Sequence, residues 1–208
     1  MRYSGTHPLW LNSEIAENGE GMKRLNSRVK FVTFLSATLS LFFVTVLPGI
    51  AQAQLTEQSK LSINGIGSVL VGMTVPEASK AAGRPLVSTG DSGGGSNCFY
   101  LTPEGGPRDV GFMVTDGRIS RVDIWKDSRV TTLSGARIGD TEARIKALYP
   151  GKIQVSPHKY VQGGHYLTFV PKDRSDSNYR LVFETDGNRV TQYRAGKLPE
   201  VEFVEGCA

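Results

Sequence analysis

Four pairs of short segments recur in the same order along this chain, and this internal repeat constrains the fold more than any other feature. The offsets between the paired segments are 67, 68, 66 and 70 residues, so they drift only where a loop can change length. Self-similarity of this kind indicates one supersecondary unit used twice. The paired segments begin at Val71 and Ile138, at Gly83 and Gly151, at Tyr100 and Tyr166, and at Phe112 and Val182.

Each copy begins with a short helix. In the first copy, Thr74 followed by Glu77 predicts a capping box, and in the second copy Asp140 or Thr141 is expected to cap. Gly83 and the pair at 150–151 are expected to end the two helices.

Short strands follow each helix. The Asp-Gly pairs at 116–117 and 186–187 predict tight hairpin turns. Helix followed by meander, twice, predicts an α+β fold of two tandem repeats, each an antiparallel sheet with helices on one face. The expected strands are 98–103, 109–115 and 118–125 in the first copy and 152–156, 165–171, 178–185, 189–195 and 201–204 in the second.

The N-terminal region has the pattern of a secretory signal. Basic residues between 22 and 30 precede an apolar run over 31–46, and Ala51-Gln52-Ala53 supplies a cleavage site. The run is also near the lower limit for a membrane anchor, but the cleavage site favours removal and a periplasmic or extracellular protein without a membrane span. The predicted organisation is a mis-called extension at 1–21, a signal peptide at 22–53, a linker at 54–63, and repeats at 64–132 and 133–208.

Two features of composition narrow the function. The only cysteines, Cys98 and Cys207, are expected to form one disulfide in an exported chain, although two free thiols or an intermolecular bridge stay open. Five of the 24 basic and three of the 20 acidic residues lie in the first 53 positions, so the remainder has a net charge of only +2. Without a Lys/Arg cluster, we expect no nucleic-acid partner.

The helix start at 72–77, the Gly-x-Pro at 83–85 and the strand that runs into Asp116-Gly117 resemble the small outer-membrane lipoprotein family SmpA/OmlA (BamE type). Two such modules, over about residues 64–205, look like the beta-lactamase inhibitory protein family. The resemblance implies one continuous curved sheet whose concave face and hairpin loops grip a partner protein. Two features depart from these families: the single possible disulfide, and Gln54 where the lipoproteins have a lipidated cysteine.

No set of catalytic or metal-binding residues emerges. The Gly-Asp-Ser-Gly-Gly motif at 90–94 resembles a protease serine loop, but no histidine precedes it in the predicted mature chain. His158 and His165 lack the further ligands that zinc requires. Asp123 and Glu184 are interpreted as solvent-facing strand residues. We therefore expect no enzyme activity, no metal and no cofactor.

Aromatic residues on or beside the expected strands are the strongest candidates for a binding surface, because Tyr and Trp anchor many interfaces. For each of them a place in the core stays open. The sequence predicts an exported, inhibitor-like module that binds another exported protein with an open sheet face, of undetermined oligomeric state. The alternative is an envelope-maintenance protein that binds cell-wall or outer-membrane components. The candidate binding residues are Tyr100, Trp125, Tyr160, Tyr166, Tyr179 and Tyr193.

Overall fold

The computed structural model describes residues 54–88 and 97–207. The predicted extension, the signal peptide and the Gly-Asp-Ser-Gly-Gly motif lie outside the described residues. Within the described part, 40% of the residues are in strands and 14% in helices. The protein is therefore mostly β.

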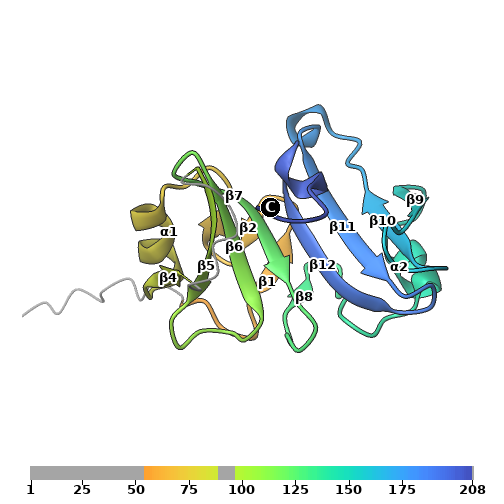
Figure 1. Ribbon diagram of the computed structural model, residues 1–208, viewed down its shortest axis with the longest axis horizontal. Coiled ribbons are helices and arrows are strands. Elements are labelled where there is room, and N and C mark those ends of the chain that lie inside the picture. Colours follow the sequence, from red (N-terminus) through yellow and green to blue (C-terminus); the bar gives the residue numbers. More distant parts are fainter. Residues whose placement is uncertain (1–53, 89–96, 208) are drawn as a thin grey trace, which may run out of the picture. The chain divides into compact units, whose positions relative to one another are not determined.

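Eight antiparallel strands form the larger sheet, in the order β4-β5-β6-β7-β12-β11-β10-β9 (Figure 1). The two halves join where β7 pairs with β12, with Asp123 opposite Arg194. Seven of the eight strands agree with the expected ranges, and the exception, β4, was not predicted. The bounds are β4 Leu86–Ser88, β5 Cys98–Pro103, β6 Val110–Thr115, β7 Arg118–Ile124, β9 Ile153–Pro157, β10 His165–Phe169, β11 Tyr179–Thr185 and β12 Val190–Lys197.

A second, smaller sheet has the order β3-β2-β1-β8, and it was not predicted. Its strands are two or three residues long: β1 Lys60–Ser62, β2 Gly65–Ile66, β3 Val69–Leu70 and β8 Thr131–Thr132. Strand β1 lies in the stretch expected to be a linker, and it pairs in parallel with β8, far along the chain. Leu61, Ile66 and Val69 are at most 1% exposed, so this sheet covers the core of the larger one.

The described part of the chain contains only two short α-helices, α1 over Val75–Ala82 and α2 over Glu142–Leu148. Thr74 and Glu77 form the expected capping box, and in the second helix it is Thr141 that caps, by accepting a hydrogen bond from the Arg144 amide. Each helix ends after two turns. The two helices and the smaller sheet together cover one face of the larger sheet. The predicted α+β fold of two helix–sheet repeats is therefore wrong.

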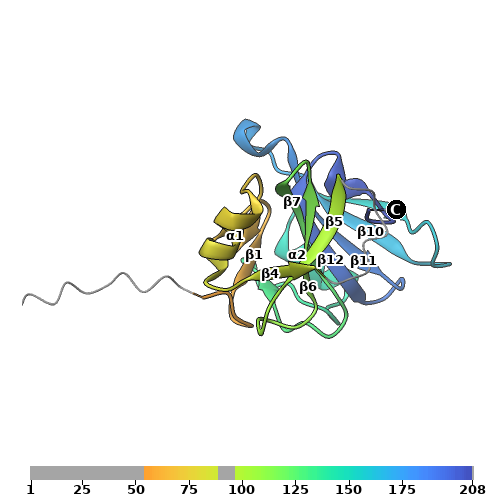
Figure 2. The same cartoon turned by 60° about the vertical axis from the view of Figure 1, so that its left-hand side comes forward.

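The core lies between the larger sheet and the layer formed by the helices and the smaller sheet. Alternate strand residues point into it, as the two-residue period of a strand requires. Figure 2 shows α1 and β1 on one side of the larger sheet and the C-terminus on the other. Large side chains that are at most 1% exposed here include Phe112, Ile119, Ile145, Phe183 and Tyr193.

The two helix starts are held by the same set of hydrogen bonds. The amide of Gly72 donates to the carbonyl of Ile119 over 2.7 Å, and the amide of Gly139 donates to the carbonyl of Val190 over 2.9 Å. The guanidinium groups of Arg118 and Arg189 then donate back to the carbonyls of Gly72 and Gly139, over 2.7 and 2.8 Å. Each helix start is thus tied to a hairpin of the larger sheet in the same way.

The two Asp-Gly turns differ. Asp116 and Gly117 both have positive φ, 50° and 74°, as the expected tight hairpin turn requires. In the second turn only Gly187 has positive φ, and the Asp186 carboxylate instead accepts hydrogen bonds from the amides of Asn188 and Arg189. The larger offset of the last repeated segment arises before this turn, in the connection between β10 and β11, which contains a 3-10 helix over Arg174–Asp176.

Candidate interaction face of the eight-stranded sheet

The side of the larger sheet that faces away from the core is crossed by the last residues of the chain. We call residues 198–207 the strap, and the side of the sheet that it crosses the strap face. The strap contains a 3-10 helix, η2, over Glu200–Glu202, so the strand expected at 201–204 is wrong. Val201 is fully buried against Tyr166 and Val182 in a small apolar cluster separate from the main core.

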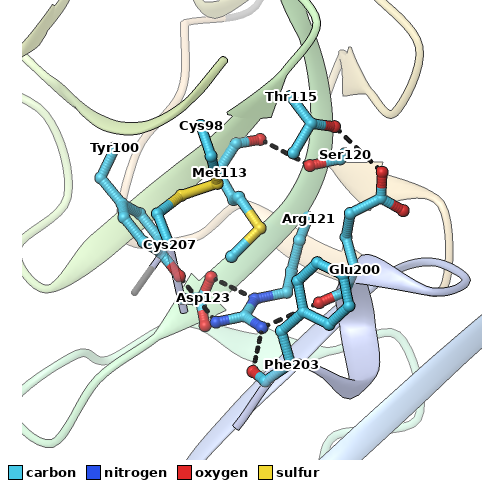
Figure 3. The surroundings of a disulfide bond; sticks show 10 residues. All are labelled: Cys98, Tyr100, Met113, Thr115, Ser120, Arg121, Asp123, Glu200, Phe203 and Cys207. Carbon is cyan, nitrogen blue, oxygen red and sulfur yellow. Dashed lines mark hydrogen bonds and ion pairs between the residues drawn. A yellow bond between two sulfur atoms is a disulfide. The ribbon is translucent and has the colours of Figure 1, made fainter. Parts of the chain in front are cut away.

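Arg121, at the centre of β7, binds the strap by its backbone (Figure 3). Its Nη1 donates to the carbonyls of Glu200 and Phe203, over 2.9 and 2.6 Å. Its Nε donates to Asp123 Oδ2 over 2.8 Å, and its Nη2 donates to the Tyr100 hydroxyl over 2.6 Å. The side chains of Arg121 and Asp123 are only 4% and 7% exposed, so this is a buried, fully engaged ion pair.

Arg194, on β12, has a corresponding role beside it. Its Nε donates to the carbonyl of Val201 over 2.7 Å, and its Nη1 donates to Glu184 Oε1. The second oxygen of Glu184 accepts hydrogen bonds from Gln192 Nε2, over 2.6 Å, and is paired with His158 Nε2 at 3.1 Å. Two arginines, each neutralised by a buried carboxylate, thus hold the strap against the sheet.

The tautomer of His158 follows from its neighbours. Its Nδ1 lies 3.1 Å from the backbone amides of both Tyr160 and Val161, which can only donate. Nδ1 therefore accepts, and Nε2 carries the proton that it shares with Glu184. The ring also stacks on Tyr166, with 4.4 Å between centroids, so the histidine has a structural place in this cluster.

Burial and charge oppose each other at Glu184. Burial by itself would raise the pKa of this carboxyl, but the charge of Arg194 and the hydrogen bonds from Gln192, Arg194 and His158 hold the pKa below its usual value. At Tyr100, burial and the charge of Asp123 raise the pKa of the hydroxyl. Glu184 is therefore anionic and Tyr100 neutral at neutral pH, and neither is poised for proton transfer.

A disulfide joins the far end of the strap to β5. Cys98 and Cys207 are bonded as predicted, and they are 109 residues apart in the sequence. Such a bond agrees with an oxidising compartment. On the outer side of the strap, Glu205 accepts hydrogen bonds from Tyr160 and from Lys159. The 157–164 loop therefore contacts the strap.

The six predicted binding aromatics do not share one surface. Tyr100, Trp125 and Tyr166 lie on the strap face, where the rings of Tyr100 and Trp125 are 5.9 Å apart. Tyr160 is 60% exposed and lies in the loop beside the strap. Tyr179 lies half-buried at the end of β11, on the strand side that carries Leu181 and Phe183.

Tyr193 does not belong to the binding surface, which corrects the prediction. It is 1% exposed, packs on Phe183 in the main core, and donates its hydroxyl to the carbonyl of Val130. Strand alternation places it opposite to Arg194, on the core side of β12.

The charged residues that build the strap face were missed by the sequence reasoning. Asp123 and Glu184, predicted to face solvent, are 5% and 4% exposed and are buried under the strap. Alternation places Arg121 and Asp123 on one side of β7, and Arg194 on the same side of β12. The sequence signal for this buried cluster was the placing of two arginines and two acids on one face of adjacent strands.

Comparison with known proteins found no family model, no curated protein and no solved structure that matches this chain.

Other parts of the described chain are weaker candidates for a functional site. A hollow of about 560 Å³ lies near the smaller sheet and the end of α2, with Tyr149, Phe169 and Leu181 in its wall. Its polar rim carries two lysines and two aspartates. Among residues 54–88 and 97–207, no three histidine, cysteine or acidic side chains gather as metal ligands, and no helix is long and apolar enough to cross a membrane.

Proposed function

We propose that this protein is an exported, non-enzymatic module that binds another exported protein through the strap and the loop beside it. One observation carries the proposal. Of the seven large apolar side chains that are exposed in the described chain, Tyr160, Val161 and Phe203 all belong to the strap or to the 157–164 loop. Exposed apolar side chains that gather at one place are typical of protein-binding surfaces.

The local geometry supports this assignment. A hollow of about 330 Å³ lies beside Lys159, Phe203 and Glu205, next to the exposed aromatics. Lys159 and Glu205, which both line it, form an ion pair at 3.0 Å, so the two charges neutralise each other. An apolar centre with a polar rim is the usual anatomy of an interface.

We assign no catalytic role to the strap face. Asp123 and Glu184 are buried acids of this face, and each is ion-paired with an arginine beneath the strap. A general acid or base needs access to a substrate proton and a pKa near the working pH. Both carboxylates are buried, and at Glu184 the charge of Arg194 and the hydrogen bonds outweigh burial and keep the pKa below its usual value.

We also propose that this chain is related to the beta-lactamase inhibitory proteins and to the SmpA/OmlA modules. The matching hydrogen bonds at the two helix starts, from Gly72 and from Gly139, support a duplicated origin of the two halves. Secretion behind a cleaved signal peptide is supported by the Cys98–Cys207 disulfide.

The test is capture of a partner by three matched proteins. The oxidised protein is immobilised beside a Tyr160→Ala/Phe203→Ala variant and a control, Leu70→Ala/Leu133→Ala, that removes two exposed side chains far from the strap. We expect one partner that the wild type and the control retain and that the strap-side variant loses. Equal capture by all three would contradict the surface assigned here.

A different outcome would favour the alternative function. If the protein instead co-sediments with cell wall or outer membrane and retains no protein partner, the envelope-maintenance role replaces the binding module.

A further inference from the structure

The strap is recognised mainly through its backbone. Arg121 binds the carbonyls of Glu200 and Phe203, and Arg194 binds the carbonyl of Val201. Carbonyl oxygens are common to all peptides, so these three contacts would hold any chain that crosses the face with the same local shape. The charge-assisted bonds are strong, because both donors are cations and are buried.

The side-chain requirement is small. Val201 alone is fully buried, between Tyr166 and Val182, and Val204 packs against the edge of the same cluster. A hollow of about 180 Å³ remains beside these residues. A peptide therefore needs a valine-sized side chain at the position of Val201 and an acceptor at that of Glu200, whose Oε1 accepts a hydrogen bond from Thr115 Oγ1 over 3.0 Å. The hollow leaves space for a larger side chain at the position of Val204.

The strap is bound to the sheet without being part of it. From Glu200 onward none of its described residues pairs in a strand ladder, and its amides at Glu202 and Phe203 bond only within the strap. One oxygen of the Glu200 carboxylate is buried without a partner in the described chain, a cost that release of the strap would relieve. The Cys98–Cys207 disulfide is its only covalent attachment besides the chain itself.

We propose that the strap face is a peptide-binding site, that residues 200–204 fill it in cis, and that the Cys98–Cys207 disulfide latches them there. The partner that this site fits is a peptide segment that takes the same 3-10 turn as residues 200–202, with a β-branched aliphatic residue over Tyr166 and Val182. This inference goes beyond the proposed function, because it assigns a second site beneath the strap, whereas the surface proposed above lies on the outer side of the strap and on the loop beside it.

The latch opens by thiol–disulfide exchange with a small dithiol reductant. The reductant gives two electrons and two protons to the Cys98–Cys207 bond, which becomes two thiols, while the reductant closes its own disulfide. The freed strap then competes with a peptide in trans only through its non-covalent contacts.

The test uses a fluorescent peptide with the sequence of residues 198–208 and Cys207→Ser. It is titrated against the oxidised wild type and against the full chain carrying Val201→Asp and Cys207→Ser, in which the strap has lost its anchor and its latch. The same peptide with Val201→Asp is the matched control. The substitutions lie outside the main core, and thermal unfolding confirms that the variant is folded.

We expect the peptide to bind the variant and not the oxidised wild type. For a peptide of about 10 µM affinity, a tethered strap at an effective concentration of about 1 mM weakens binding by about 100-fold. The control peptide should bind neither protein. Failure of the wild-type peptide to bind the folded variant would overturn the proposal.

Hydrogen exchange on the wild type tests the disulfide latch without the variant, and so applies even if the variant does not fold. After reduction, the amides of residues 200–206 should exchange faster, while those of β6 and β11 stay unchanged. Unchanged exchange in the strap would overturn the latch. Binding of the peptide without any captured protein partner would instead count against the proposed function, and leave the peptide site intact.

Discussion

Replacing Arg194 by methionine would leave the Glu184 carboxylate buried beneath the strap without its cation. Both side chains are only 5% exposed, so solvent cannot take over the role of the arginine. Removing one partner of a buried ion pair costs about 3–5 kcal/mol of unfolding free energy. His158 and Gln192 still hold the second oxygen of Glu184, which favours the lower end, about 3 kcal/mol.

The loss of unfolding free energy in the Arg194→Met variant should depend on pH. In the folded wild type the pKa of Glu184 is below its unfolded value, so the stability it contributes is complete above about pH 4.3 and is lost as the pH falls through the folded pKa. Without Arg194, burial raises the pKa of Glu184, and the carboxyl accepts a proton more readily. The difference in unfolding free energy between the wild type and the Arg194→Met variant should therefore be smaller at acidic pH.

Urea unfolding at pH 7 and at about pH 3.5, followed by Trp fluorescence, measures both effects. The double variant Glu184→Gln/Arg194→Met is the matched control, because it removes both charges and should recover most of the loss. A loss below about 1 kcal/mol in the single variant, or the same loss at both pH values, would refute the reasoning.

Three further predictions concern other contacts. Gly111→Ala places a Cβ 2.1 Å from Trp125 Cη2, and we expect a loss of about 1–3 kcal/mol in urea unfolding; an unchanged midpoint would contradict the packing described here. Replacing both cysteines by serine opens a link between residues 109 positions apart, and calorimetry should show a loss of about 4–5 kcal/mol if chain entropy dominates. Tyr193→Phe removes the hydrogen bond to the Val130 carbonyl, and should cost about 1–3 kcal/mol while partner capture stays at the wild-type level; weaker capture by the folded variant would show that this tyrosine contacts the partner after all.

The elements of the larger sheet were largely predictable, because their signals are local. The Asp116-Gly117 turn has positive φ at both positions, which few other residue pairs adopt readily. The capping box at Thr74 and Glu77 likewise begins a helix within a few residues. The smaller sheet has no such signal, because β1 and β8 are three and two residues long and join positions 71 residues apart, such as Lys60 and Thr131.

The site was only partly predictable. The exposed Tyr160 and the strap-face residues Tyr100, Trp125 and Tyr166 were among the candidates, whereas Tyr193 is a core residue. The arginines and acids under the strap were not recognised. Charged residues in strands are usually exposed, and only a segment that returns over the sheet can bury them.

The sequence by itself determined the positions of seven strands of the larger sheet and the two helix starts, and its two cysteines allowed a single intramolecular pairing. The two-residue period of a strand also divides its side chains between two faces. The period cannot say which face the chain will cover, or with what. That was decided by the tertiary structure, in which Arg121 and Arg194 hold the C-terminal backbone and the Cys98–Cys207 bond fixes its end. Such contacts join residues far apart in the sequence, and they form only when the whole sheet is assembled.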